Sequence, residues 1–114
     1  MSNLISAKDL EFLLYDVFKA EQLTELPFYK DHDRATFDGV IATAEKIATD
    51  HFLPHNAKAD ANEPLFDGES VTTIDEVKVA WQHYSQSGLL AARHSFDDGG
   101  MQLPAIINTA CVSY

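Results

Sequence analysis

Histidine is the residue type whose spacing first suggests chemistry in this sequence. His51 and His55 lie four residues apart, which is the spacing that places two imidazoles on one helix face for metal binding. Pro54 lies between them, and because proline breaks a helix, the shared face is lost. The single cysteine also offers no pair of thiolates for zinc. We therefore predict no metal site, and we expect the histidines at the surface, with one at a helix end.

The acidic and glycine-containing segments also lack the patterns of known ligand sites. A calcium loop needs glycine at its sixth position and glutamate at its twelfth, and the segments that start at Asp31 and Asp60 have neither. The Gly99-Gly100 pair lacks the lysine and Ser/Thr of a phosphate loop and is typical of a tight turn that enters a helix. No Gly-x-Ser-x-Gly elbow presents a nucleophile, and Cys111 is expected to pack rather than react. We therefore assign no catalytic, cofactor-binding or metal-binding residue.

The elements that carry these residues are predicted to be helices, because four segments show helical periodicity and none shows a convincing strand pattern. The first helix follows Ser6, which with Asp9 resembles a capping box. Its apolar face comprises Leu10, Leu13, Leu14, Val17 and Phe18. Pro27 disfavours helical geometry in the residue before it, so this helix should end before Leu26.

The second and third helices have clearer limits. Asp33 is predicted to cap the second helix and Pro54 to end it. Its stripe consists of Phe37, Val40, Ile41, Ala44, Ile47, Ala48, His51 and Phe52. The third helix is predicted to start at the capping box 73–76 and to end at Gly88, which fits a left-handed position. Its apolar face is Val77, Ala80, Trp81 and Tyr84, and we expect Trp81 in the core.

Two long loops, residues 55–71 and 89–103, are predicted between the helices. A loop as long as the first is uncommon in compact domains, so residues 55–71 should be functional or lie over a surface that other parts of the protein complete. Pro104 is predicted to open a fourth helix, whose apolar stripe is Ile106, Ile107 and Ala110. No stop signal precedes Tyr114, so we expect a helix that is cut short and a chain that is the front part of a longer protein. A stripe without a partner predicts a homo-oligomer.

Composition sets the class of the molecule. The 114 residues are 46% hydrophobic and 23% charged, which is ordinary for one globular domain. The formal charge of −10 makes binding to nucleic acid or to an anionic membrane surface unfavourable. No apolar run approaches about 18 residues, so no membrane span is predicted. The start resembles no secretory signal, and one cysteine forms no internal disulfide, so we predict a cytoplasmic protein.

Short motifs follow one another in a specific order along nearly the whole chain. They are Tyr15-Asp16-Val17-Phe18, Leu26-Pro27, Phe52-Leu53-Pro54-His55-Asn56, Asp67-Gly68, Val71-Thr72-Thr73 and Gly99-Gly100-Met101-Gln102-Leu103-Pro104. This order resembles the N-terminal helical domain of acyl-CoA dehydrogenases, closest to the extended branch that includes 3-methylmercaptopropionyl-CoA dehydrogenase. The family turn has a second glycine where this chain has Gln102, and glutamine does not readily adopt positive φ.

The resemblance implies a fold and an activity. The expected fold is an all-α, bundle-like domain of about four helices, with residues 1–114 as the N-terminal domain of an enzyme that uses FAD to oxidise an acyl-CoA to the 2,3-enoyl-CoA. The flavin and a glutamate base would belong to later domains, and no FAD is expected on this fragment. Its expected role is packing and part of the acyl-pocket wall, which would be positioned by Gly99, Gly100, Leu103 and Pro104.

The partners of the whole enzyme would be the acyl-CoA substrate and an electron-transfer acceptor. The alternative interpretation is a stand-alone acidic helical module, whose protein partner covers the face of Phe, Trp and Tyr side chains. The gene sequence after Tyr114 discriminates the two, because a long continuing frame favours the enzyme and a stop codon favours the module.

Overall fold

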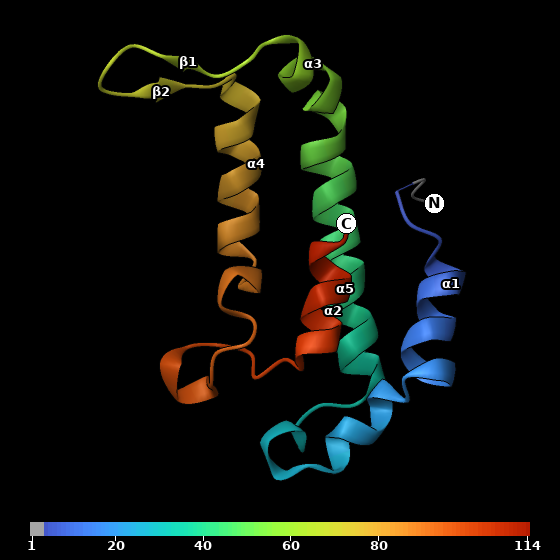
Figure 1. The fold of residues 1–114 in the computed structure, drawn as a ribbon. Helices are drawn as coiled ribbons and strands as arrows, with labels where there is room; N and C mark the ends of the chain where they lie inside the picture. Colours follow the sequence, from blue (N-terminus) through green and yellow to red (C-terminus); the bar gives the residue numbers. More distant parts are fainter. Residues whose placement is uncertain (1–3) are drawn as a thin grey trace.

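The computed structural model describes residues 4–114 and consists mainly of helices (Figure 1). The α-helices are α1 Ala7–Glu11, α2 Arg34–Ile47, α3 Asn56–Ala61, α4 Asp75–Gln86 and α5 Ala105–Val112, and the strands are β1 Leu65–Phe66 and β2 Val71–Thr72. Two π-helical segments, Phe12–Val17 and Ala48–Phe52, extend α1 and α2. Short 3-10 turns occupy Ala20–Glu25, Pro27–Tyr29, Leu53–His55, Leu89–Ala91 and Phe96–Asp98. The predicted all-α class is confirmed, with one small hairpin added.

The first helix begins where the sequence predicts. The Ser6 side chain accepts a hydrogen bond from the backbone N–H of Asp9 at 3.3 Å, as an N-cap does. The helix stops at Val17, earlier than the limit set by Pro27, and Lys19 follows with a φ of +53°. Its predicted face is only partly right, because Phe18 is 61% exposed. The π-helical segment takes more residues per turn than an α-helix, so the 3.6-residue stripe loses its alignment.

The second helix carries the main core. The Asp33 carboxylate accepts the backbone N–H of Thr36 at 2.7 Å, which confirms the predicted cap. Phe37 is fully buried, and Ala44 and Ala48 follow it on the buried face. The larger of two buried clusters surrounds Phe37 and comprises Leu14, Tyr15, Ala20, Phe37, Ala92, Leu103, Ile107 and Ala110. A smaller cluster comprises Ala44, Leu89 and Cys111.

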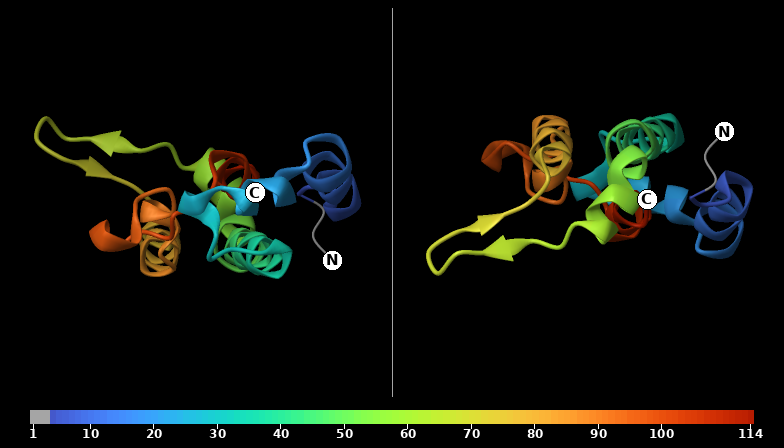
Figure 2. Two further views of the ribbon diagram at one scale, coloured as in Figure 1. Left: turned by 90° about the horizontal axis from the view of Figure 1, so that it is seen from below. Right: turned by 90° about the horizontal axis from the view of Figure 1, so that it is seen from above.

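The segment 55–71 is not the unstructured loop expected from the sequence. It contains α3 and the first strand of the hairpin, in which Leu65 pairs with Thr72 and Phe66 with Val71. Figures 1 and 2 show the hairpin projecting away from the helices. The Asp67 carboxylate accepts two backbone N–H groups at the tip, so local turn chemistry shapes this arm.

The third predicted helix, α4, runs beside α2 but with a different face inward. Its N-cap is Ile74, which makes no side-chain cap hydrogen bond, so the predicted capping box was wrong. Gly88 has a φ of +86° and confirms the predicted end. The prediction of a core Trp81 is also wrong, because that side chain is 51% exposed. The fully buried Ala80 lies at the interface instead, since a methyl group lets two helices approach closely.

The last helix, α5, packs on α2 within the same chain. Ile107 is completely buried, and Ala110 is 4% exposed. The expectation that the stripe of α5 lacks a partner in this chain is therefore wrong. This stripe therefore gives no support to self-association, although Val112 remains 66% exposed.

Candidate functional site

The turn before α5 contains the four residues that the sequence singled out. Gly99 ends a 3-10 turn with a φ of +79°, a conformation that side chains disfavour. Gly100 lies against the preceding segment, and a Cβ atom there would stand 2.2 Å from the carbonyl oxygen of His94. Both glycines are therefore required by the shape of the turn.

Leu103 and Pro104 lie inside the protein, where they hold the start of α5. Both side chains are fully buried. The Leu103 N–H donates to the Ala92 carbonyl at 2.8 Å, which ties the turn to the segment after α4. None of the cavities described below is lined by these residues. The four predicted residues thus meet in one turn that positions α5.

Two further residues hold this turn, and sequence reasoning missed both roles. Gln102 adopts a φ of +47°, and its side chain bridges two segments: its oxygen accepts the Phe96 N–H at 2.9 Å and its amide donates to the Phe28 carbonyl at 2.8 Å. The Nε2 atom of His32 lies 2.8 Å from the Met101 carbonyl. His32 is buried rather than at the surface as expected.

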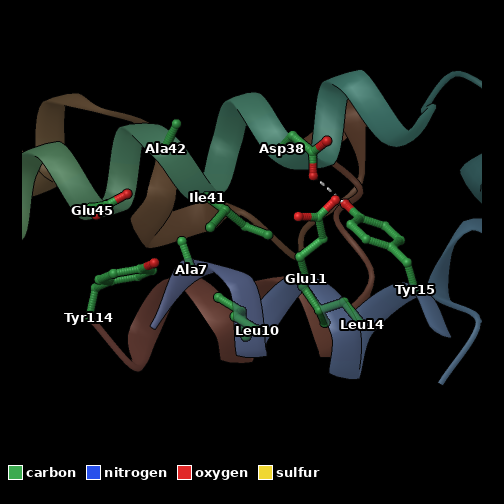
Figure 3. A pocket seen from close by; sticks show the side chains of 10 residues that line it. All are labelled: Ala7, Leu10, Glu11, Leu14, Tyr15, Asp38, Ile41, Ala42, Glu45 and Tyr114. Carbon is green, nitrogen blue, oxygen red and sulfur yellow. Dashed lines mark hydrogen bonds between the residues drawn. The ribbon is translucent and has the colours of Figure 1, made fainter. Parts of the chain in front are cut away.

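A cleft between α1 and α2 is lined by polar and apolar side chains, among them Tyr15, Asp38 and Glu11 (Figure 3). Its volume is about 220 Å³. The Tyr15 hydroxyl donates to the Asp38 carboxylate at 2.6 Å, and the Arg34 guanidinium lies 4.1 Å from the centre of the Tyr15 ring. Burial, followed by the hydrogen bond to Asp38, raises the pKa of Tyr15 well above its usual value. The phenol therefore stays protonated at neutral pH, and its hydrogen bond to Asp38 ties the π-helical extension of α1 to α2.

A second cavity, which we call the apolar groove, lies between α2, α4 and the end of α5. It has a volume of about 340 Å³. The lining residues are Ala44, Ile47, Ala48, Phe52, Trp81, Tyr84, Leu89, Cys111, Val112 and Tyr114, none of which is charged. The Trp81 and Tyr84 rings lie 5.6 Å apart between centroids. Burial raises the pKa of the Cys111 thiol to about 11, so it is a packing group near neutral pH.

Two of the other histidines form a contact between helices. The His51 and His83 rings are stacked, with centroids 3.6 Å apart, and so join the π-helical end of α2 to α4. His55 is buried, contrary to the expectation for surface histidines. Within residues 4–114, no group of three or more His, Cys, Asp or Glu side chains is arranged to hold a metal ion. In the same range, no helix has the length and apolar character needed to cross a membrane.

Comparisons of the chain with protein-family models, curated proteins and solved structures found no match. Its function therefore has to be inferred from the residues and the geometry above.

Proposed function

We propose that residues 1–114 form the N-terminal helical domain of a flavin-dependent acyl-CoA dehydrogenase. The whole enzyme would oxidise an acyl-CoA thioester to the 2,3-enoyl-CoA. A base would remove the α-proton while a hydride leaves the β-carbon, and an electron-transfer acceptor would then take up the two electrons. In this proposal the enzyme is a cytoplasmic homo-oligomer whose subunit contacts do not use the α5 stripe, because Ile107 and Ala110 are buried within their own chain. The present domain contributes packing and part of the acyl-pocket wall.

The backbone of the Gly99–Pro104 turn is the observation that supports this proposal. The family turn carries glycine at the position that Gln102 occupies here. Gln102 nevertheless adopts a φ of +47°, a conformation that glycine reaches at little cost and other residues rarely adopt. A positive φ at this position is the conformation to which a glycine would be suited, and this supports the proposal. The two side-chain hydrogen bonds of Gln102 offset the strain.

The two cavities described above do not fit a flavin. The apolar groove has no charged lining residue for a pyrophosphate. The cleft between α1 and α2 presents the carboxylates of Glu11, Asp38 and Glu45, which would repel phosphate. No catalytic step is therefore assigned to a residue of this chain. FAD, which would accept the hydride, belongs in this proposal to the domains that follow.

The test begins with the gene. We expect the reading frame to continue past Tyr114 for several hundred codons, and the encoded protein to be yellow when purified. Under anaerobic conditions, adding acyl-CoA thioesters of several chain lengths should bleach the visible flavin absorbance, because two electrons pass to the flavin. Free coenzyme A, which has no acyl chain to oxidise, is the control. A full-length protein that binds no flavin, or whose flavin no acyl-CoA reduces, contradicts the proposal.

One observation favours the alternative, a stand-alone acidic interaction module. Trp81 is 51% exposed at the edge of the apolar groove, as an aromatic anchor for a partner would be. This alternative requires a stop codon directly after Tyr114. Purification of the chain from its native source would then yield a protein of 12.7 kDa.

A further inference from the structure

A third hollow lies between the end of α4, the segment that follows it and α5. Its volume is about 410 Å³, within the range of about 300–1,000 Å³ that is usual for small-molecule sites. The polar side chains that line it are those of Tyr84, Arg93, His94 and Asn108. We call it the basic hollow, because Arg93 is its charged lining residue and no carboxylate lines it.

This lining differs from that of the other polar hollows of the protein. The chain has 18 Asp and Glu residues against 8 Lys and Arg. The cleft between α1 and α2 is accordingly lined by three carboxylates, and a hollow near the start of α4 is lined by Asp50, Asp75 and Glu76. An anion in the basic hollow would meet no such like charge on the walls, although the chain as a whole repels anions.

The polar groups of the basic hollow are available to a ligand. The Arg34 guanidinium pairs with Glu11 and Asp38, whereas within residues 4–114 Arg93 makes no ion pair. In the same part of the chain, no hydrogen bond involves the side chains of Arg93, His94 or Asn108. A guanidinium presents its N–H donors as a planar fork that matches a carboxylate or a phosphate, and the Asn108 amide adds two donors.

The backbone that carries Arg93 is fixed on both sides. The Ala92 carbonyl accepts the Leu103 N–H at 2.8 Å, and the His94 carbonyl accepts the Gln102 N–H at 2.8 Å. These bonds tie the segment to the turn before α5. Because the chain is already held before and after Arg93, a ligand need not order this backbone when it binds, and less entropy is lost.

Apolar side chains complete the wall of the hollow. Leu89 and Ala92 are buried, and Leu90 is 56% exposed. We infer that the basic hollow binds a small organic anion. Its carboxylate or phosphate contacts Arg93 and Asn108, and its short apolar chain lies against Leu90 and the Tyr84 ring. This inference does not depend on the proposed enzymatic activity.

Titrations with simple probes test this inference. Hexyl phosphate and hexanoate share one apolar chain and differ in the anionic group, and hexylammonium and hexanol are the cationic and neutral controls. In nuclear magnetic resonance spectra of the isotope-labelled protein, the Arg93 Nε–H and the Asn108 amide report on the hollow. At about 0.15 M salt, where charges are screened beyond about 8 Å, at least one anion should shift both signals in a saturable one-to-one titration. Neither control should do so.

Three variants locate the binding. Arg93→Gln should weaken the anion at least about tenfold, because a charge-assisted contact is lost. Lys78→Gln removes the same charge from α4 outside the hollow and should leave the affinity unchanged. Asn108→Asp keeps the shape of the side chain but places a carboxylate in the hollow, so it should abolish binding. Circular dichroism establishes that all three variants fold.

Several results would overturn the inference. If neither anion binds saturably, the hollow is not an anion site. If hexanol binds as tightly as the anions, the hollow recognises apolar chains alone. Equal weakening by Arg93→Gln and Lys78→Gln would show that the anions respond only to the net charge of the protein. Inorganic phosphate should bind more weakly than hexyl phosphate, and equal binding would contradict the role given to Leu90 and Tyr84. If the inference holds, the anion that binds more tightly identifies the preferred anionic group.

Discussion

Replacement of Gly100 by alanine tests the account of the turn before α5. An alanine Cβ would stand 2.2 Å from the carbonyl oxygen and 2.4 Å from the carbonyl carbon of His94. These are backbone atoms, so no side-chain rotation can relieve the overlap. The His94 carbonyl also accepts the N–H of Gln102 at 2.8 Å, so any movement weakens that bond.

The expected cost combines two effects. Overpacking typically costs about 1–3 kcal/mol, and a weakened hydrogen bond adds about 0.5–1.5 kcal/mol. We therefore expect Gly100→Ala to lower the free energy of unfolding by roughly 2–4 kcal/mol, a large share of the total of about 5–15 kcal/mol for a typical domain. Urea denaturation followed by circular dichroism measures this as a lower midpoint at unchanged slope.

Two other glycines provide matched controls. Gly39 lies within α2 with nothing within 4 Å of an added Cβ, so Gly39→Ala should stabilise the protein by about 0.5–1 kcal/mol. An added Cβ at Gly99 would meet no atom within 4 Å, but the φ of this residue is +79°, so Gly99→Ala should lower the free energy of unfolding by about 1–2 kcal/mol. We therefore expect the free energy of unfolding to decrease from the Gly39→Ala variant to the Gly99→Ala variant and to be lowest in Gly100→Ala. Equal effects at Gly99 and Gly100, or a loss at Gly100 below about 0.5 kcal/mol, would refute the reasoning from backbone contact.

Three further predictions concern single side chains. Hydrogen bonds from Thr36 lower the pKa of Asp33. The ionised Asp33 carboxylate should therefore stabilise the folded protein at neutral pH, and this stabilisation should disappear as the pH falls through the lowered pKa. Asp33→Asn, which caps without charge, should flatten this part of the unfolding profile measured against pH. Gln102→Ala should lower the free energy of unfolding, measured by urea denaturation, by about 1–3 kcal/mol, because the Phe96 N–H and the Phe28 carbonyl lose their partners. Gln102→Gly should recover part of that loss, because glycine adopts a positive φ without strain. Cys111, whose pKa is raised to about 11 by burial, should react with a thiol reagent at pH 8 far more slowly in the folded protein than in denaturant, and equal rates would contradict its burial.

Most features that depend on local sequence were predicted correctly, and the capping box at residues 73–76 is the exception. The caps at Ser6 and Asp33 and the left-handed Gly88 follow from the few residues around each position. The four predicted helices follow from apolar periodicity, whereas α3 lies in a segment that was predicted to be a loop. The turn at Gly99 was also expected from the glycine pair alone.

Features that depend on the packing partner were not predicted. Trp81 lies on the apolar stripe of α4, but the fully buried residue of this helix is Ala80, and His83 stacks on His51 of the π-helical extension of α2. Periodicity shows that a helix has an apolar side, and it does not show how far the partner helix covers that side. For the same reason, the sequence did not indicate that the apolar stripe of α5 packs on α2 of the same chain.

The candidate site was predicted only in part. The sequence identified the glycines of the turn, and it did not indicate that the Gln102 side chain and the buried His32 hold that turn in place. Both contacts join segments about 70 residues apart in the chain. No local pattern signals such pairs, because they arise only when the helices have come together.

The hairpin lies in the connection between α2 and α4 and projects away from the helices (Figure 1). The length of this connection can therefore change without a change in the core. The strands of the hairpin are held by their own pairing and by the turn at Asp67, and Phe66 is 69% exposed. Chain closure becomes only about 0.6 kcal/mol less favourable for each doubling of a flexible loop. Residues inserted at Gly68 would therefore leave the pairing of α2 with α4 intact. The link between these two helices is thus a place where the protein can gain or lose sequence during evolution without refolding its interior.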